Sequence, residues 1–176
     1  NESKNSILSD QNVRIALNVA LNKQSIVKQV FDGKAFVAES PFLPFMKGYN
    51  KKANEPQGET GSLKKAEEIL EMAGWQVKAN NEDKKIRSKV IEGRETSLEF
   101  DLIVPQSEIL IETAKTLEGI WSRIGVKVNL KVVSLNEIET NYFSNRSYQT
   151  IIFGNILSSE PDLFSFWHSS QKFPPG

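Results

Sequence analysis

The sequence has no cysteine and a single histidine, His168, among its 176 residues. Disulfides, thiolate metal ligands and cysteine nucleophiles are therefore excluded, and His168 alone cannot form a histidine cluster for zinc or non-haem iron. The chain also lacks the Gly-x-Ser-x-Gly motif that presents a catalytic serine, which disfavours a hydrolase built on His168. We expect no metal site, no cofactor and no catalytic centre.

An excess of charge of one sign is also missing, because 22 basic residues balance 22 acidic ones. A chain without net charge has no global field to attract nucleic acid or an anionic membrane, so we expect neither partner. The basic cluster Lys84, Lys85, Arg87 and Lys89 lies between acidic residues and indicates a solvated hairpin, not a phosphate-binding face. No apolar run approaches the roughly 20 residues that a membrane-spanning helix needs.

The second half of the chain shows two kinds of hydrophobic periodicity, one typical of strands and one typical of helices. Apolar residues alternate with polar ones over 98–104 and again over 126–132, which predicts two strands. Residues 107–124 between them, capped by Ser107 and ended by Gly125, show helical spacing. The aromatic and β-branched run 148–153 indicates a third strand. We predict an α/β fold with a mixed sheet, parallel βαβ crossovers and flanking helices, in which 98–104, 126–133 and 148–153 share one sheet.

Other helices are predicted around this unit. One begins after Ser9 or Asp10 and continues, whole or in two parts, to Gly33, and another runs from Ser62 to Gly74. Short helices are expected near 135–143 and, after Pro161, at 162–168.

Two segments lack a clear period. Residues 39–61 are predicted to be a long loop whose Phe42, Phe45 and Tyr49 pack it down, and residues 76–96 are predicted to be polar and irregular. Among the core candidates, Trp121 is expected to bury the largest area, so that Trp121→Ala unfolds or loosens the domain.

Four blocks of sequence together resemble the family-5 extracellular solute-binding proteins. The first, residues 10–23, contains the Val13-Arg14-Ile15-Ala16-Leu17 motif and ends in Asn22-Lys23. The other three follow in the family's order and spacing: 65–70 with 73–75, 117–121 with 124–128, and 160–162 with 166–170. The resemblance runs from about Ser9 to Gly176. It implies that residues 1–176 are a single lobe of a longer, two-lobed protein.

The resemblance also implies a function. In this family a solute, such as a peptide, is enclosed between two lobes and delivered to an ABC transporter permease, outside the cytoplasmic membrane and commonly from a lipid-anchored protein. This chain would supply one lobe, and a missing N-terminal lobe the other. Two alternatives stay open: a protein-interaction or chaperone-like module on the same scaffold, and a hydrolase.

The ligand is expected where the last predicted strand leaves the sheet, since open α/β sheets bind ligands at the carboxyl ends of their strands. Peptide-binding members of the family present an aspartate four residues before a proline, and that position before Pro161 is Leu157. We therefore expect a solute without an amino terminus clamped there, or a peptide held elsewhere. The candidate ligand contacts are Gly154, Asn155, Ile156, Leu157, Ser158 and Trp167.

Overall fold

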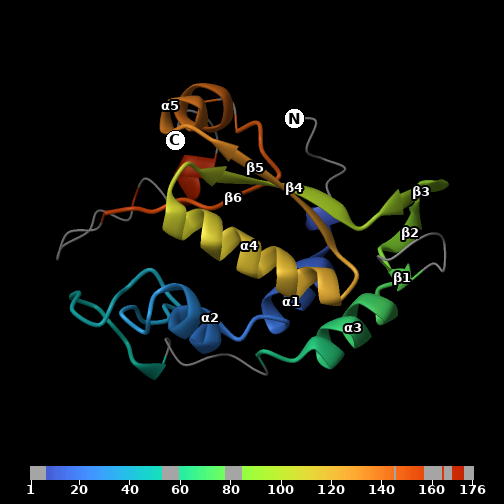
Figure 1. Cartoon of the computed structure of the whole chain (residues 1–176), viewed down its shortest axis with the longest axis horizontal. Helices are drawn as coiled ribbons and strands as arrows, with labels where there is room; N and C mark the ends of the chain where they lie inside the picture. The colour runs from blue at the N-terminus through green and yellow to red at the C-terminus, as the bar shows by residue number, and fades with distance from the viewer. Residues whose placement is uncertain are drawn as a thin grey trace.

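The computed structural model describes residues 7–52, 60–77, 85–144, 146–156, 164 and 168–172. Figure 1 shows α4 running along one side of a small parallel sheet, with α1, α2 and α3 beyond it and α5 on the other side of the sheet. The elements in chain order are η2 (Ile7–Ser9), α1 (Gln11–Val19), α2 (Lys23–Val30), α3 (Leu63–Met72), β1 (Gln76–Val77), β2 (Arg87–Ile91), β3 (Arg94–Ser97), β4 (Glu99–Pro105), α4 (Glu108–Arg123), β5 (Lys127–Val133), α5 (Leu135–Glu137), η4 (Ile138–Phe143), β6 (Thr150–Ile151) and η5 (Ser169–Lys172).

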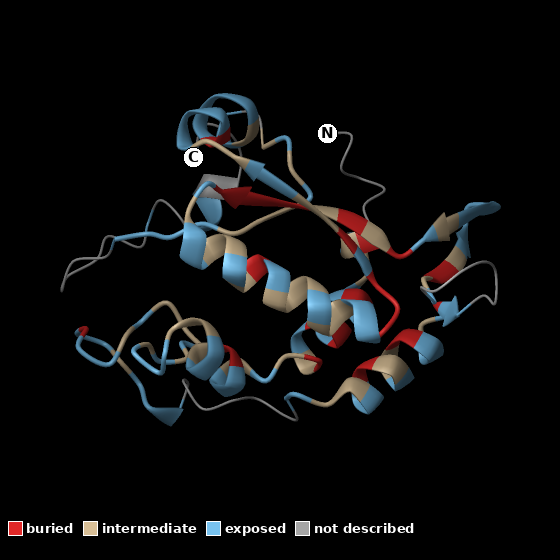
Figure 2. Ribbon diagram, in the orientation of Figure 1, coloured by how far each residue is buried: buried red, intermediate tan, exposed pale blue. Residues whose placement is uncertain are grey.

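The parallel sheet has the order β5-β4-β6 and confirms the predicted α/β unit. β4 and β5 pair over their whole length, from Glu99 opposite Lys127 to Pro105 opposite Val133, and β6 pairs with the other edge of β4. β4 is the central strand and is buried on both faces, as Figure 2 shows, so it needs an almost continuous apolar run at Leu102, Ile103 and Val104. The third strand is shorter than the predicted 148–153.

Each α-helix begins after a polar residue of a type that commonly caps helices. The side chains of Asp10 and Ser62 accept hydrogen bonds from the first turns of α1 and α3, as predicted. The predicted first helix is two helices, because Asn22 caps a new one and accepts from the backbone N–H of Ser25. Ser107 occupies the N-cap position of α4 without a side-chain cap hydrogen bond.

The loop after α2 does not pack as predicted. Phe42 and Phe45 are exposed, whereas Met46 is buried. A salt bridge of 2.7 Å between Lys23 Nζ and Glu39 Oε2 ties the loop back to α2. Phe42 and Phe45 are therefore surface groups, Tyr49 is half-buried, and the buried anchor is a methionine, whose flexible side chain fits irregular gaps.

The largest fully buried side chain is Trp75 and not, as predicted, Trp121. Trp75 is 0% exposed, and its indole N–H donates to Asp10 Oδ2 at 3.2 Å, which links the end of α3 to the start of α1. Trp121 is half-buried between layers: its ring packs edge-on against Phe100 of β4, and its indole N–H donates to the carbonyl of Leu17 in α1. An indole that must reach a polar partner is seldom fully buried on a helix that also faces solvent.

Gln76–Val77, Arg87–Ile91 and Arg94–Ser97 form an antiparallel sheet, so the prediction of an irregular segment over 76–96 is wrong for these residues. β2 pairs with β1 on one side and with β3 on the other. Glu92 and Gly93, which join β2 to β3, both have positive φ, 50° and 77°, as two-residue hairpin turns require. The predicted hairpin is thereby confirmed, but Arg87 is not a solvated residue of it.

Arg87 is only 2% exposed, and its guanidinium joins the ends of three elements. Nη1 donates to the carbonyl of Trp75, Nε donates to the carbonyl of Ile124 at the end of α4, and Nη2 meets Glu71 Oε1 of α3 at 3.2 Å. A cation at helix C-termini satisfies carbonyls that have no intrahelical partner. The burial of this charge is therefore balanced by hydrogen bonds.

Gly125 makes this approach possible. Its φ is +82°, and a Cβ atom there would lie 2.8 Å from Arg87 Cγ and 2.9 Å from the carbonyl oxygen of Lys85. A larger residue would therefore need both a strained backbone and a displaced arginine. The turn from α4 into β5 thus depends on this glycine.

We predict that Arg87→Ala lowers the free energy of unfolding by about 2 to 6 kcal/mol, because two buried carbonyls lose their donor at about 1–3 kcal/mol each. Urea unfolding at pH 7 measures the change. Lys85→Ala, at an exposed residue two positions earlier, is the matched control and should stay within about 0.5 kcal/mol of the parent. Equal effects of the two substitutions would contradict this role for Arg87.

Asp10 predicts part of the acid sensitivity. Burial acts to raise its pKa, but hydrogen bonds from the Asn12 N–H, the Trp75 indole and Lys89 outweigh burial and hold the pKa below its usual value. A carboxylate with a lowered folded-state pKa contributes stability above its unfolded pKa of about 3.9, and this stability is lost as the pH falls through the folded pKa.

Asp10→Asn should therefore lower stability at neutral pH and flatten the loss of stability below about pH 4. The urea midpoint measured from pH 7 down to pH 2.5 tests this, with Asp32→Asn, at an exposed aspartate after α2, as the matched control. A variant with the acid slope of the parent chain would show that Asp10 has no such role.

Candidate functional site

A pocket of about 510 Å³ lies where the strands of the parallel sheet end. Pro105 is the last residue of β4, Leu135 follows β5 by two residues, and Gly154 follows β6 by three. The first turn of α4 adds Ser107 and Leu110, and η4 adds Ile138, Glu139 and Phe143. Because the strands are parallel, their carboxyl ends meet at one edge, and chain segments that are distant in sequence wall one hollow.

Local hydrogen bonds hold the wall formed by α5 and η4. Ser134 Oγ accepts from the backbone N–H of Glu137, and Glu137 Oε2 accepts from the Ser134 N–H at 2.8 Å, so the two residues cap each other. The hydrogen bond from the Ser134 backbone holds the pKa of Glu137 below its usual value. Ile138, buried, anchors the next turn in the core. The wall is therefore preformed.

Aromatic rings form the floor of the pocket near β6. Phe143 and Phe153 pack edge-on with ring centroids 5.3 Å apart, and Phe143 packs in the same way on Tyr148 at 6.2 Å. Phe143 and Phe153 stay 38% and 42% exposed, and Leu135 at the mouth is 74% exposed. Large apolar side chains gathered at one accessible place mark a contact surface for a ligand or a partner.

The chain leaving this pocket is open to solvent. Gly154, Asn155 and Ile156 are exposed, Ile156 completely, and a Cβ atom at Gly154 would meet no atom within 4 Å. Of the six predicted ligand contacts, Gly154 lines the pocket, and Asn155 and Ile156 follow it in the exposed chain. The other three, Leu157, Ser158 and Trp167, lie outside the described residues, as do Leu157 to Pro161, on which the expectation of a missing amino-terminus clamp rests.

Several pocket residues were not among the predicted contacts. Leu135, Ile138 and Phe143 were assigned to a short helix, and Leu110 to the apolar face of α4. Their helical spacing is the same as that of core residues, so spacing alone does not separate a pocket wall from the core. Their position directly after a strand end was the available signal.

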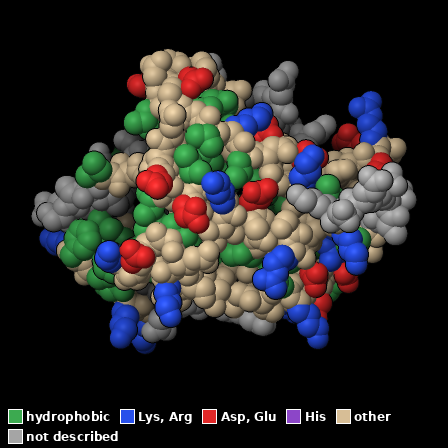
Figure 3. Space-filling model, viewed as in Figure 1, with side chains coloured by type: hydrophobic (Ala, Val, Ile, Leu, Met, Phe, Trp, Pro, Cys, Tyr) green, Lys and Arg blue, Asp and Glu red, His purple; other side chains and the backbone are tan. Residues whose placement is uncertain are grey.

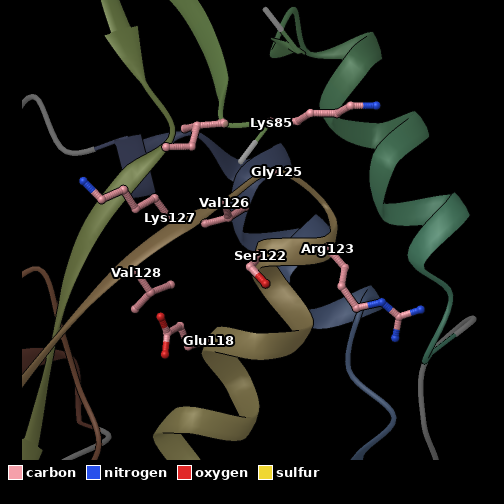
Figure 4. Close-up of a pocket in the computed structure, with 9 residues that line it drawn as sticks. Lys85, Glu118, Ser122, Arg123, Gly125, Val126, Lys127 and Val128 are labelled. Atoms are coloured by element: carbon pink, nitrogen blue, oxygen red, sulfur yellow. The ribbon is translucent and has the colours of Figure 1, made fainter. Parts of the chain in front are cut away.

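A second hollow, of about 460 Å³, lies at the opposite edge of the sheet, beside the turn from α4 into β5 (Figure 4). Its basic residues are Lys85, Arg123 and Lys127, and Figure 4 shows the amino group of Lys127 pointing to the side opposite to the charged ends of Lys85 and Arg123. Lys127 Nζ is also paired with Glu99 at 2.8 Å. Because the cations diverge, this hollow does not form an anion site.

Charged residues on the face of the sheet away from α4 satisfy one another. Lys127 and Lys131 pair with Glu99 and Asp101, and Asn129 Nδ2 donates to both carboxylates. The hydrogen bond from Lys127 is the main cause that holds the pKa of Glu99 below its usual value, and the hydrogen bond from Lys131 does the same for the pKa of Asp101. The amide of Asn129 contributes to both. Figure 3 likewise shows basic and acidic side chains interspersed over one face. This ladder stabilises the strand pairing and offers no unbalanced charge to a ligand.

His168 is exposed. Its ring stacks on Phe164 at 4.5 Å, and its Nδ1 lies 2.8 Å from Ser170 Oγ. Within the described part of the chain, no group of three or more histidine, cysteine or acidic residues is placed to hold a metal ion. In the same part, no helix has the length and apolarity to cross a membrane.

The sequence leaves three hypotheses open, a solute-binding lobe, a protein-interaction module and a hydrolase, and similarity to known proteins bears on them. The model of the family described as "Bacterial extracellular solute-binding proteins, family 5 Middle" matches residues 1–174. The chain belongs to this family. Membership confirms the resemblance seen in the sequence, and it places the chain among solute-binding proteins and not among hydrolases or other enzymes.

Relatives of this chain include proteins of known structure. The oligopeptide-binding protein AppA of Bacillus subtilis (strain 168) is 31% identical over 170 residues, 96% of this chain and 30% of AppA. The AppA structure with a nonapeptide has a TM-score of 0.78, over 97% of this chain and 32% of that one. NikZ from Campylobacter jejuni, with Ni(L-His), is 26% identical with a TM-score of 0.74, over 96% and 31%. The chain thus spans about a third of the length of these relatives.

Proposed function

We propose that the complete protein is the solute-binding component of an ABC importer, that residues 1–176 form one lobe of it, and that peptides are its solutes. One observation carries the proposal: an apolar pocket and an exposed chain, Gly154 to Ile156, lie together at the carboxyl edge of the parallel sheet. An apolar hollow beside free backbone groups suits a ligand that has both side chains and a peptide backbone.

The partners follow from the same proposal. A missing N-terminal lobe would face this edge and close over the solute, and a membrane permease would receive the solute outside the cytoplasmic membrane. The family description names its members as bacterial and extracellular, which supports this location. A lipid anchor in the complete protein rests on the family resemblance alone.

The proposal extends to how the peptide is held. The residue four positions before Pro161 is Leu157, so the carboxylate that clamps an amino terminus in peptide-binding relatives is replaced by an apolar side chain. We infer that the peptide terminus is not paired at this point and that the backbone of Gly154 and Asn155, with Ile156, Ser158 and Trp167, contacts the chain of the ligand instead. A charge-assisted pair of about 1.5–3 kcal/mol is then absent at this place.

We predict that residues 1–176 alone fold but bind peptides at least about 100-fold more weakly than the complete protein. Half of the contacts and the exclusion of water come from the other lobe, and each loss of 1.4 kcal/mol costs a factor of ten in affinity. Isothermal titration of both proteins with nonapeptides and pentapeptides measures the difference. Binding by the isolated residues 1–176 within about tenfold of the complete protein would contradict the two-lobed site.

The same titration distinguishes the possible classes of solute and the possible ways in which a peptide is held. Peptides with a free and with an acetylated amino terminus should bind the complete protein equally well if no clamp is present. Binding of nickel–histidine complexes in place of peptides would overturn the assignment of the solute class. Capture of unfolded proteins by residues 1–176 without small-solute binding would favour an interaction module.

A further inference from the structure

The strongest unassigned feature is the chemical asymmetry of the pocket at the carboxyl edge. Leu110, Leu135, Ile138, Phe143 and Phe153 make its surface apolar, and Glu139 is the only charged residue among those that line it. Its volume of about 510 Å³ is in the range of small-ligand pockets. An apolar pocket with one carboxylate distinguishes among ligand groups both by hydrophobicity and by the sign of their charge.

Glu139 is available for that discrimination, unlike its neighbour. The carboxylate of Glu137 is occupied by the N–H and hydroxyl of Ser134. Within the described residues, Glu139 makes hydrogen bonds through its backbone carbonyl, which accepts from the N–H and the hydroxyl of Ser144, and its carboxylate has no cationic partner. Glu139 is exposed in this structure. A second negative charge brought into the pocket would be repelled by this carboxylate, and the repulsion grows as a bound ligand displaces the water that screens it.

The open chain at the rim indicates what enters the pocket. Gly154 is both a lining residue and the first of the exposed residues that the proposed function assigns to the ligand backbone. A peptide lying along residues 154–156 therefore has its nearest side chain at the mouth of the pocket. The edge-on rings of Phe143 and Phe153 present the faces and edges that a further aromatic ring packs against.

We propose that this pocket is a side-chain subsite of the solute-binding protein, that it takes a large apolar residue of the bound peptide, preferably an aromatic one, and that Glu139 makes it reject acidic residues. The proposal rests on the proposed function and specifies its solute class: peptides with an aromatic or large aliphatic residue at one position and no aspartate or glutamate there.

The experiment uses the complete protein and alanine pentapeptides that carry one phenylalanine or one aspartate at each position in turn. Isothermal titration should find one position at which phenylalanine tightens binding about tenfold over alanine and aspartate weakens it. Leu135→Ser, at a residue already exposed at the mouth, should reduce the phenylalanine advantage about fivefold, since less apolar surface is buried. Glu139→Gln should reduce the aspartate penalty at least about threefold and leave the phenylalanine peptide unchanged.

Met72→Ser is the matched control, because Met72 is also a highly exposed apolar residue, 88% against 74% for Leu135, and it lies on α3 and does not line the pocket. It should leave all affinities unchanged. If peptides bind but the phenylalanine advantage is absent, or is the same in Leu135→Ser, the subsite is wrong while the peptide-binding function stands. If no pentapeptide binds, the proposed solute class itself fails, and the subsite with it.

Another possible occupant of the pocket is a further segment of the protein's own chain. Thermal unfolding of the three variants tests for it. If Leu135→Ser lowers the melting temperature well beyond Met72→Ser and leaves peptide selectivity unaltered, the pocket is filled from within the protein. That result would overturn the subsite. Equal melting temperatures together with altered selectivity would support it.

Discussion

The buried guanidinium of Arg87 is the interaction on which the arrangement of this chain depends. Arg87 reaches the carbonyls that end the α3 segment and α4, and its own backbone N–H donates to the carbonyl of Gly125. These bonds place the antiparallel hairpin against the turn from α4 into β5. Since a buried cation without partners would be strongly unfavourable, the bonds have to form together, and only glycine fits at position 125.

The position of that turn determines what lies at the other end of the sheet. Where β5 starts decides its register on β4, and a slip of one residue would turn Lys127 and Lys131 toward α4 and Val128 away from it. The register observed carries Val133 level with Pro105, so that α4 begins and α5 follows at the same edge. The pocket is built from these ends, with Phe153 and Gly154 added by β6. A structural arginine at one edge thus positions the pocket of the candidate site at the other.

The sequence predicts those parts of the fold that local patterns determine. The alternation over 98–104 and 126–132, the helical spacing between them and the caps at Asp10 and Ser62 all reappear in the structure. The hairpin of β2 and β3 was expected from its charged residues, but its strands were not, because the buried residues are Arg87 and Ser88 and leave no apolar alternation. The pair Glu92-Gly93 was the signal for its turn. The ranking of Trp121 above Trp75 failed because burial depends on what packs across from a residue, and the Asp10 partner of Trp75 is 65 residues away.

For the candidate site, the sequence predicts ligand contacts at the carboxyl edge, which stay a prediction, and it does not indicate the pocket at that edge. Gly154, Asn155 and Ile156 follow from the rule that ligands meet the carboxyl ends of parallel strands. Leu110, Ile138 and Phe143 could not be predicted as pocket walls, because separate segments of the chain have to converge to form the pocket. No local sequence pattern shows that convergence. Arg87 and Lys89, in contrast, are close in sequence but differ in the structure, because Arg87 is buried against the carbonyls of Trp75 and Ile124 whereas Lys89 pairs with Asp10.

Hydrogen–deuterium exchange of the complete protein with and without a bound peptide tests the central claim most directly, namely that the carboxyl edge of the parallel sheet faces the solute. The account predicts that the peptide slows exchange of backbone amides at residues 134–143 and 152–156 and leaves residues 85–90 and 122–128 unchanged, because the first two segments border the pocket and the last two lie at the opposite edge. Protection concentrated at residues 122–128, with residues 152–156 exchanging as in the free protein, would contradict it.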